Sequence, residues 1–149
     1  MSNKSNDGVL VVAGGGGFIG GHLVAALRAQ GRPVRAVDIK PLNEWYQKFD
    51  DVDNVVADLK LLENARASCK GASVVYQLAA DMGGMGFIEH NKALCMLSVL
   101  TNTHMIEAAR EAKVDRFFYA SSACVYAADK QTDANVTALK EEDAYPAMP

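Results

Sequence analysis

A run of glycines near the start of the chain has the spacing of a phosphate-binding turn. Gly14, Gly17 and Gly20 fit the pattern G-x-x-G-x-x-G, and Gly15, Gly17 and Gly20 fit G-x-G-x-x-G equally well. Both patterns serve the same chemistry. Small residues let backbone N–H groups approach a diphosphate, and the following helix points its positive end at the phosphate charge. The run therefore predicts a dinucleotide site.

An acid at the end of the second predicted strand stands where dinucleotide-binding folds recognise the adenosine ribose. A carboxylate at Asp38 can accept hydrogen bonds from both ribose hydroxyls and would repel a 2′-phosphate. The sequence therefore favours NAD over NADP, although Lys40 nearby could soften this preference. The alternative interpretation is a plain tight turn with Asp38 as a surface acid.

The segments that must position these residues alternate between strand and helix patterns. Apolar runs predict strands at residues 9–12, 32–37, 54–57, 74–78 and 116–120, and helical spacing predicts helices at residues 18–30, 61–69 and 91–112. Such alternation is typical of the α/β class, here a Rossmann-type doubly wound parallel sheet. We expect the strand order 3-2-1-4-5, with the switch point between the first and fourth strands and the fold truncated after the fifth.

Two further expectations concern the loop after the fourth strand and the long helix that follows it. Residues 81–87, with Gly83, Gly84 and Gly86, are expected to form a flexible loop. The apolar face of the long helix is expected to consist of Leu94, Leu97, Met105, Ile106 and Ala109.

Composition excludes several classes of protein. The 149 residues suggest one domain, residues 1–149, and the net charge of −3 does not indicate a nucleic-acid surface. Apolar runs are too short for a membrane span, and residues 1–8 lack a secretory signal core. The three cysteines are scattered, and neither they nor the histidines form a metal-ligand pattern. We expect a cytoplasmic protein without a metal.

The string AGGGGFIG at residues 13–20 resembles the TGxxGFIG turn of the extended short-chain dehydrogenase/reductase family, with Ala13 in place of the usual threonine. This resemblance favours the first of the two glycine patterns. It implies cofactor contacts at Gly14, Gly17, Phe18, Ile19 and Gly20.

Further matches to the family follow in the expected order along the chain. Asp58 and Leu59 resemble the aspartate–hydrophobe pair beside the adenine. The end of the fourth strand resembles the segment that passes under the cofactor, at Leu78, Ala79 and Ala80. The string YASSACVY at residues 119–126 resembles the strand end that carries the catalytic serine, here Ser122.

Two strings are similar to a narrower group in this family, the GDP-mannose 3,5-epimerases: DMGGMGFI at residues 81–88 and FFYASSAC at residues 117–124. In that group NAD transiently oxidises the sugar at C4, and acid/base groups invert C3 and C5. The resemblance implies that Ser122 binds the C4 oxygen and that Cys124 exchanges protons at the inverting carbons. It also implies a sugar site lined by Gly83, Gly84, Ser122, Ala123 and Cys124.

Other interpretations remain open for these residues. Cys124 could be a small buried hydrophobe, and Ser122 could bond local backbone at the strand end. The chain could instead belong to a UDP-sugar 4-epimerase or a sugar-nucleotide dehydratase, relatives that more often carry threonine or another residue at the position of Cys124. It could also be a non-catalytic NAD-binding module.

The sequence departs from the family pattern in two ways. No Tyr-x-x-x-Lys pair stands at the expected place, which by family spacing would begin beyond Pro149. We therefore expect the chain alone to be inactive and the sugar-nucleotide domain to be absent from it. Ser98 stands where the family often has an asparagine, and Asn102 one turn later is out of register to replace it. The resemblance further implies a possible homodimer formed through long helices.

Overall fold

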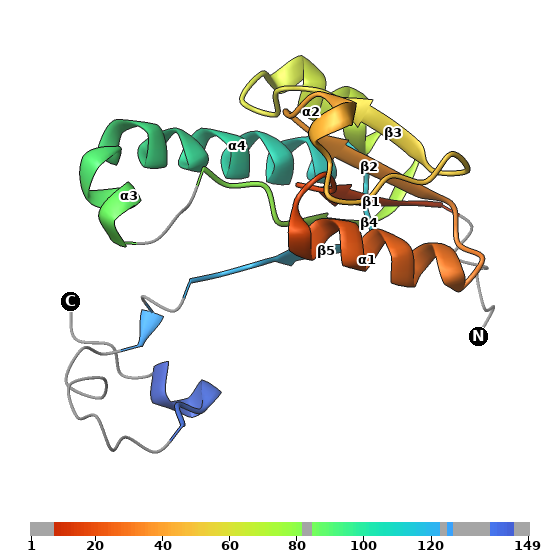
Figure 1. The fold of residues 1–149 in the computed structure, drawn as a ribbon. Coiled ribbons are helices and arrows are strands. Elements are labelled where there is room, and N and C mark those ends of the chain that lie inside the picture. Colours follow the sequence, from red (N-terminus) through yellow and green to blue (C-terminus); the bar gives the residue numbers. More distant parts are fainter. Residues whose placement is uncertain (1–7, 82–84, 123–124, 127–137, 145–149) are drawn as a thin grey trace. The chain divides into compact units, whose positions relative to one another are not determined.

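The computed structural model describes residues 8–81, 85–122, 125–126 and 138–144 (Figure 1). The chain divides into two compact units, Met1–Tyr119 and Ala120–Pro149. The strands of the first unit are β1 Val9–Ala13, β2 Val34–Asp38, β3 Asp53–Val56, β4 Ala72–Gln77 and β5 Arg116–Tyr119. Its helices are α1 Phe18–Ala29, α2 Leu62–Cys69, α3 Met85–His90 and α4 Lys92–Glu111, with a short 3₁₀ helix, η1, at Leu42–Glu44.

The strands form a single parallel sheet in the order β3-β2-β1-β4-β5, which confirms the predicted topology. β1 lies at the centre, with Val12 opposite Ala36 of β2 on one side and Tyr76 of β4 on the other. The chain therefore adds β2 and β3 on one side of β1 and then crosses to the other side, where it adds β4 and β5. At such a switch point the connections after neighbouring strands diverge and leave a crevice at the carboxyl ends.

Two hydrophobic clusters cover the two faces of the sheet. Alternate β1 residues serve each face: Val11 packs with Met105 of α4 and Cys69 of α2, whereas Val12 packs with Val24 of α1. Accordingly, α1 lies on one side of the sheet in Figure 1, and α2 and α4 lie on the other. Burial on both faces explains why β1 is a continuous apolar run.

The first helix is bounded by a glycine at each end. It begins after Gly17 and is followed by Gly31, whose φ of +70° is the left-handed conformation that glycine adopts most readily. The Gly31 N–H donates to the Arg28 carbonyl at 2.9 Å and so satisfies a carbonyl at the helix end. This geometry fixes α1 between the glycine turn and β2.

Two expectations for the segment after β4 are wrong. Part of the expected loop at residues 81–87 is helical, because α3 begins at Met85. The core-facing side of α4 is also different: Leu94, Leu97 and Ile106 are exposed, and Met105 and Ala109 are buried. The side that faces the core is completed by small or polar residues, Ser98, Thr101 and Ala108. Small residues let α4 approach the sheet and α2 closely, so hydrophobicity alone does not identify its packed face.

Within the second unit, the described residues form short local structure. The Val125 N–H donates to the Ser122 carbonyl at 3.2 Å, and residues Glu141–Ala144 form a 3₁₀ helix, η4. In the part of the chain that the structure describes, no helix combines the length and apolarity needed to cross a bilayer.

Candidate functional site

The glycine turn joins β1 to α1 in a conformation that side chains would disturb. Gly14 has a φ of +82°, and a Cβ on Gly20 would overlap the carbonyl oxygen of Gly14. A Cβ on Gly15 would lie 2.8 Å from the Cβ of Ala36 in β2. Glycine therefore lets the first turn of α1 pack directly on the loop and on the sheet, as a phosphate-binding turn requires.

The N-terminus of α1 offers backbone donors without a competing acid. No side chain caps this end, and its first turn contains no acidic residue. The first N–H groups of an α-helix have no intrahelical partner and carry a partial positive charge. Phe18 and Ile19 in this turn are 61% and 71% exposed, so the donors lie at the surface. This arrangement can bind a diphosphate.

Asp38 ends β2 beside the glycine turn, and its carboxylate is held by two backbone donors. The Gly16 N–H donates to Oδ2 at 3.0 Å, and the Lys40 N–H donates to Oδ1 at 3.1 Å. The residue is only 8% exposed. A carboxylate has about four acceptor positions, so both oxygens can still accept a hydrogen bond from a hydroxyl group.

The connection from β2 to β3 holds this turn, a feature that the sequence pattern did not reveal. Trp45 is buried, and its indole N–H donates to the Lys40 carbonyl at 2.8 Å. The Tyr46 N–H donates to the Gly16 carbonyl at 2.9 Å. Exposed Phe18 and Tyr46 stack edge to face with centroids 4.8 Å apart. Residues 40–46 therefore act as a strap across the glycine turn.

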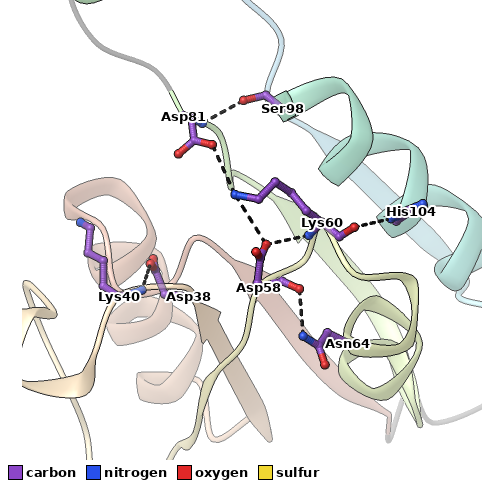
Figure 2. Close-up of polar contacts among 8 residues, drawn as sticks. All are labelled: Asp38, Lys40, Asp58, Lys60, Asn64, Asp81, Ser98 and His104. Atoms are coloured by element: carbon purple, nitrogen blue, oxygen red, sulfur yellow. Dashed lines mark hydrogen bonds and ion pairs between the residues drawn. The ribbon is translucent and has the colours of Figure 1, made fainter. Parts of the chain in front are cut away.

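A second carboxylate follows β3, and a lysine links it to the end of β4. Lys60 Nζ lies 3.7 Å from Asp58 Oδ1 and 3.9 Å from Asp81 Oδ2. The Lys60 N–H also donates to Asp58 Oδ1 at 2.9 Å, and His104 of α4 contacts the Lys60 carbonyl at 3.0 Å (Figure 2). Lys60 thus lies between the two loops (Figure 2). Sequence reasoning found Asp58 but missed Lys60.

The end of β4 is fixed by polar side chains from α4. Ser98 Oγ accepts a hydrogen bond from the Asp81 N–H at 2.9 Å, and Asn102 Oδ1 accepts one from buried Gln77 Nε2 at 2.8 Å. Gln77 Nε2 also donates to the Ala79 carbonyl at 3.0 Å. Ser98 therefore bonds the backbone at the position where the family often has asparagine, whereas Asn102 bonds the side chain of Gln77.

These loops enclose one cleft of about 210 Å³ at the carboxyl ends of the strands. Eight of the predicted cofactor contacts line it: Gly14, Gly17, Asp38, Asp58, Leu59, Leu78, Ala79 and Ala80. Drug-sized ligands usually occupy about 300–1,000 Å³, so the cleft matches part of a dinucleotide rather than the whole. The remaining predicted contacts, Phe18, Ile19 and Gly20, belong to the adjoining first turn of α1.

The predicted substrate and catalytic residues are not brought together by the described part of the chain. Ser122 belongs to the second unit, whereas Gly83, Gly84, Ala123 and Cys124 lie outside the described residues. Their roles stay predictions. Of the other cysteines, Cys69 lies in the core, where burial raises the pKa of its thiol to about 11 and keeps it neutral.

Comparison with known proteins adds three findings. The model of the family described as "NAD dependent epimerase/dehydratase family" matches residues 10–148. GDP-mannose 3,5-epimerase 1 of Oryza sativa subsp. japonica is 42% identical over 139 residues, which cover 93% of this chain and 36% of that protein. GDP-mannose 3,5-epimerase of Arabidopsis thaliana is 41% identical over 139 residues, with coverages of 93% and 37%. The chain thus spans little more than a third of these curated relatives.

Among solved structures, MoeE5 in complex with UDP-glucuronic acid and NAD is similar to this chain, with a TM-score of 0.70 and 36% identity. The match covers 80% of this chain and 38% of that one.

Proposed function

The chain belongs to the NAD dependent epimerase/dehydratase family, and we propose that it is the NAD-binding part of a nucleotide-sugar epimerase of the GDP-mannose 3,5-epimerase type. In this proposal, residues 1–149 form an incomplete Rossmann domain, and its site residues bind NAD. The match spans 36% of the rice enzyme's length, so the domain that binds the sugar nucleotide would lie elsewhere in the whole protein.

The observation that carries the cofactor proposal is the meeting of four separate strand ends in one cleft. Gly14 follows β1, Asp38 ends β2, Asp58 follows β3 and Ala79 follows β4, and all four line the cleft. The residues fit a dinucleotide: the turn has no side chain in the way, the helix end offers uncapped donors, and Asp38 retains acceptor positions for ribose hydroxyls. Asp38 would disfavour a 2′-phosphate, which supports NAD over NADP.

For the reaction, similarity to the plant enzymes supports GDP-mannose as the substrate type. When bound, NAD would supply reversible hydride transfer at the sugar C4. Ser122 would donate a hydrogen bond to the C4 oxygen, and the Cys124 thiol would exchange protons at the neighbouring inverting carbons. Gly83, Gly84 and Ala123 would line the sugar.

We further propose that residues 1–149 alone do not catalyse epimerisation of a nucleotide sugar. By family spacing, the catalytic Tyr-x-x-x-Lys pair would stand beyond Pro149 and so outside residues 1–149. Tyr126 and Lys130 share that spacing, but they directly follow the Ser122 segment and do not lie beyond the prolines near the end of the chain.

The experiment is a titration of the chain with NAD by calorimetry, followed by incubation with NAD and GDP-mannose in deuterated water. We expect heat of NAD binding and no deuterium at C3 or C5 of the sugar. Absence of NAD binding would refute the cofactor proposal, and deuterium incorporation would refute the proposed inactivity of the chain.

A second candidate is supported by the 36% identical MoeE5, whose structure contains UDP-glucuronic acid and NAD. In that case the whole protein would act on a UDP-sugar, as a 4-epimerase or dehydratase does. A whole-length protein carrying this segment distinguishes the two. Product formed from a UDP-sugar, with none from GDP-mannose, would favour this alternative.

A further inference from the structure

Trp45 lies in the connection between β2 and β3 and contacts both sides of the candidate ribose site. It is the single tryptophan of the chain and is 8% exposed. Its ring packs against Gly16 so closely that a Cβ on Gly16 would lie 2.8 Å from three of its carbons. On the other side, its indole N–H donates to the Lys40 carbonyl at 2.8 Å.

Gly16 and Lys40, both in contact with Trp45, are also the residues whose N–H groups hold the Asp38 carboxylate. Gly16 donates its N–H to Oδ2 at 3.0 Å, and Lys40 donates its N–H to Oδ1 at 3.1 Å. A shift of either backbone segment would rotate the carboxylate or free one of its oxygens. Trp45 is therefore connected to each Asp38 oxygen through one intervening residue.

A packing role alone accounts for only part of this geometry. Trp45 belongs to the hydrophobic cluster that also contains Val12, Val24 and Ala36, and any large apolar side chain could fill that space. The indole N–H adds a directed bond to a backbone carbonyl of the loop that carries Asp38. An apolar replacement of the same shape would keep the cluster and lose this bond.

We propose that Trp45 is a positioning residue for ribose recognition, which holds the Asp38 carboxylate in the orientation that accepts the ribose 2′-hydroxyl. The inference rests on the proposed NAD site. It makes the strap at residues 40–46 part of the specificity of the cleft, although Trp45 does not line the cleft itself.

The test compares binding of ADP and 2′-deoxy-ADP to the chain by calorimetry, because the two ligands differ only in the hydroxyl that Asp38 would recognise. The wild-type chain should prefer ADP. Trp45→Phe keeps an aromatic ring and removes the indole N–H, and we expect it to reduce this preference by about three- to tenfold. A purely structural role would weaken both ligands equally and leave the ratio unchanged.

Two further variants keep the test decisive. Tyr76→Phe removes a polar group from an aromatic residue packed on the same cluster and should leave the ratio unchanged. Trp45→Met likewise keeps a large apolar side chain in the cluster and lacks the indole N–H, and it should lower the ratio if Trp45→Phe does not fold.

The outcomes separate the two proposals. If the wild-type chain binds neither ADP nor NAD, the proposed function fails, and the inference with it. If the wild-type chain prefers ADP and a folded Trp45→Phe or Trp45→Met chain keeps that preference, the inference alone is overturned.

Discussion

At the scale of single residues, Asp38 combines burial with a retained capacity to bind hydroxyl groups. Two backbone N–H groups stabilise its charge, at 3.0 and 3.1 Å, in a place only 8% exposed. Hydrogen bonds to charged groups stabilise more strongly than neutral ones, so the two donors hold the carboxylate in one orientation. Its selectivity for the cofactor should depend on that charge.

Asp38→Asn should weaken NAD binding by about tenfold and reduce the discrimination against NADP, because the amide keeps the shape but loses the charge and one acceptor. Calorimetric titrations with both cofactors measure the two effects. Asp51→Asn is the matched control, since Asp51 is an exposed acid paired with Arg28 at 2.6 Å. Equal NAD affinity in wild type and Asp38→Asn would show that Asp38 does not bind the ribose.

The cleft residues that offer backbone groups or a carboxylate could be predicted from sequence, whereas those that position them could not. Gly14 and Asp38 stand at fixed offsets from strand ends, so their types and places suffice. Trp45 and Lys60 lie in connections without periodicity, and only the folded chain shows that Trp45 reaches Gly16 and that Lys60 reaches Asp81. Long-range side-chain contacts of this kind have no local signature.

At the scale of elements, α2 and α4 are joined on the surface by a bidentate ion pair. Arg66 of α2 donates from Nε and Nη2 to Glu111 of α4, at 2.6 and 2.7 Å. This hydrogen bonding lowers the pKa of Glu111 below its usual value of 4.5 and raises the pKa of Arg66. Exposure keeps the contribution small, but its sign is defined.

Because the pKa of Glu111 is depressed in the folded state, its stabilising contribution is complete above the unfolded value of 4.5 and disappears as the pH falls through the folded value. Glu111→Gln should therefore have a slightly lower Tm than wild type at about pH 7, and the difference should shrink as the pH falls below 4.5. Thermal unfolding followed by circular dichroism measures this. The control Glu89→Gln in α3 should show no such pH-dependent gap. A gap for Glu111→Gln that persists at low pH would contradict the assignment.

The order of the elements was more predictable than the faces they present. Parallel strand order follows from alternating patterns and the glycine turn, and it was confirmed. The prediction of the packed face of α4 from hydrophobicity is wrong. Ser98 and Thr101 are buried because the helix lies close to its neighbours, whereas Leu94 and Leu97 are exposed. Helical periodicity indicates which residues share a face, but close packing depends on size as well as hydrophobicity.

At the scale of the whole molecule, cofactor binding and proton exchange are assigned to different stretches of the chain. The cleft residues belong to the unit Met1–Tyr119, whereas Ser122 belongs to the unit Ala120–Pro149. The expected homodimer stays a prediction.

Cys124→Ala, made in a whole-length protein that carries this segment, should abolish deuterium incorporation at C3 and C5 of GDP-mannose and leave NAD affinity unchanged, because the thiol would be the group that exchanges those protons. Mass spectrometry of the recovered sugar and calorimetry provide the two measurements. Cys95→Ala, which removes a half-buried thiol from α4, is the control and should retain exchange. Exchange in Cys124→Ala at the wild-type rate would exclude Cys124 as the acid/base group.

The strap across the glycine turn also gives the chain an optical property. With Trp45 as its single tryptophan, the indole emission of the protein comes from one buried ring that packs on Gly16. Reduced nicotinamide absorbs in the near-ultraviolet range where indole emits, so NADH in the adjoining cleft would quench that emission by energy transfer, whereas the oxidised cofactor would not. Loading of the site could then be followed by fluorescence on the unlabelled chain, with every change in signal arising from one known position.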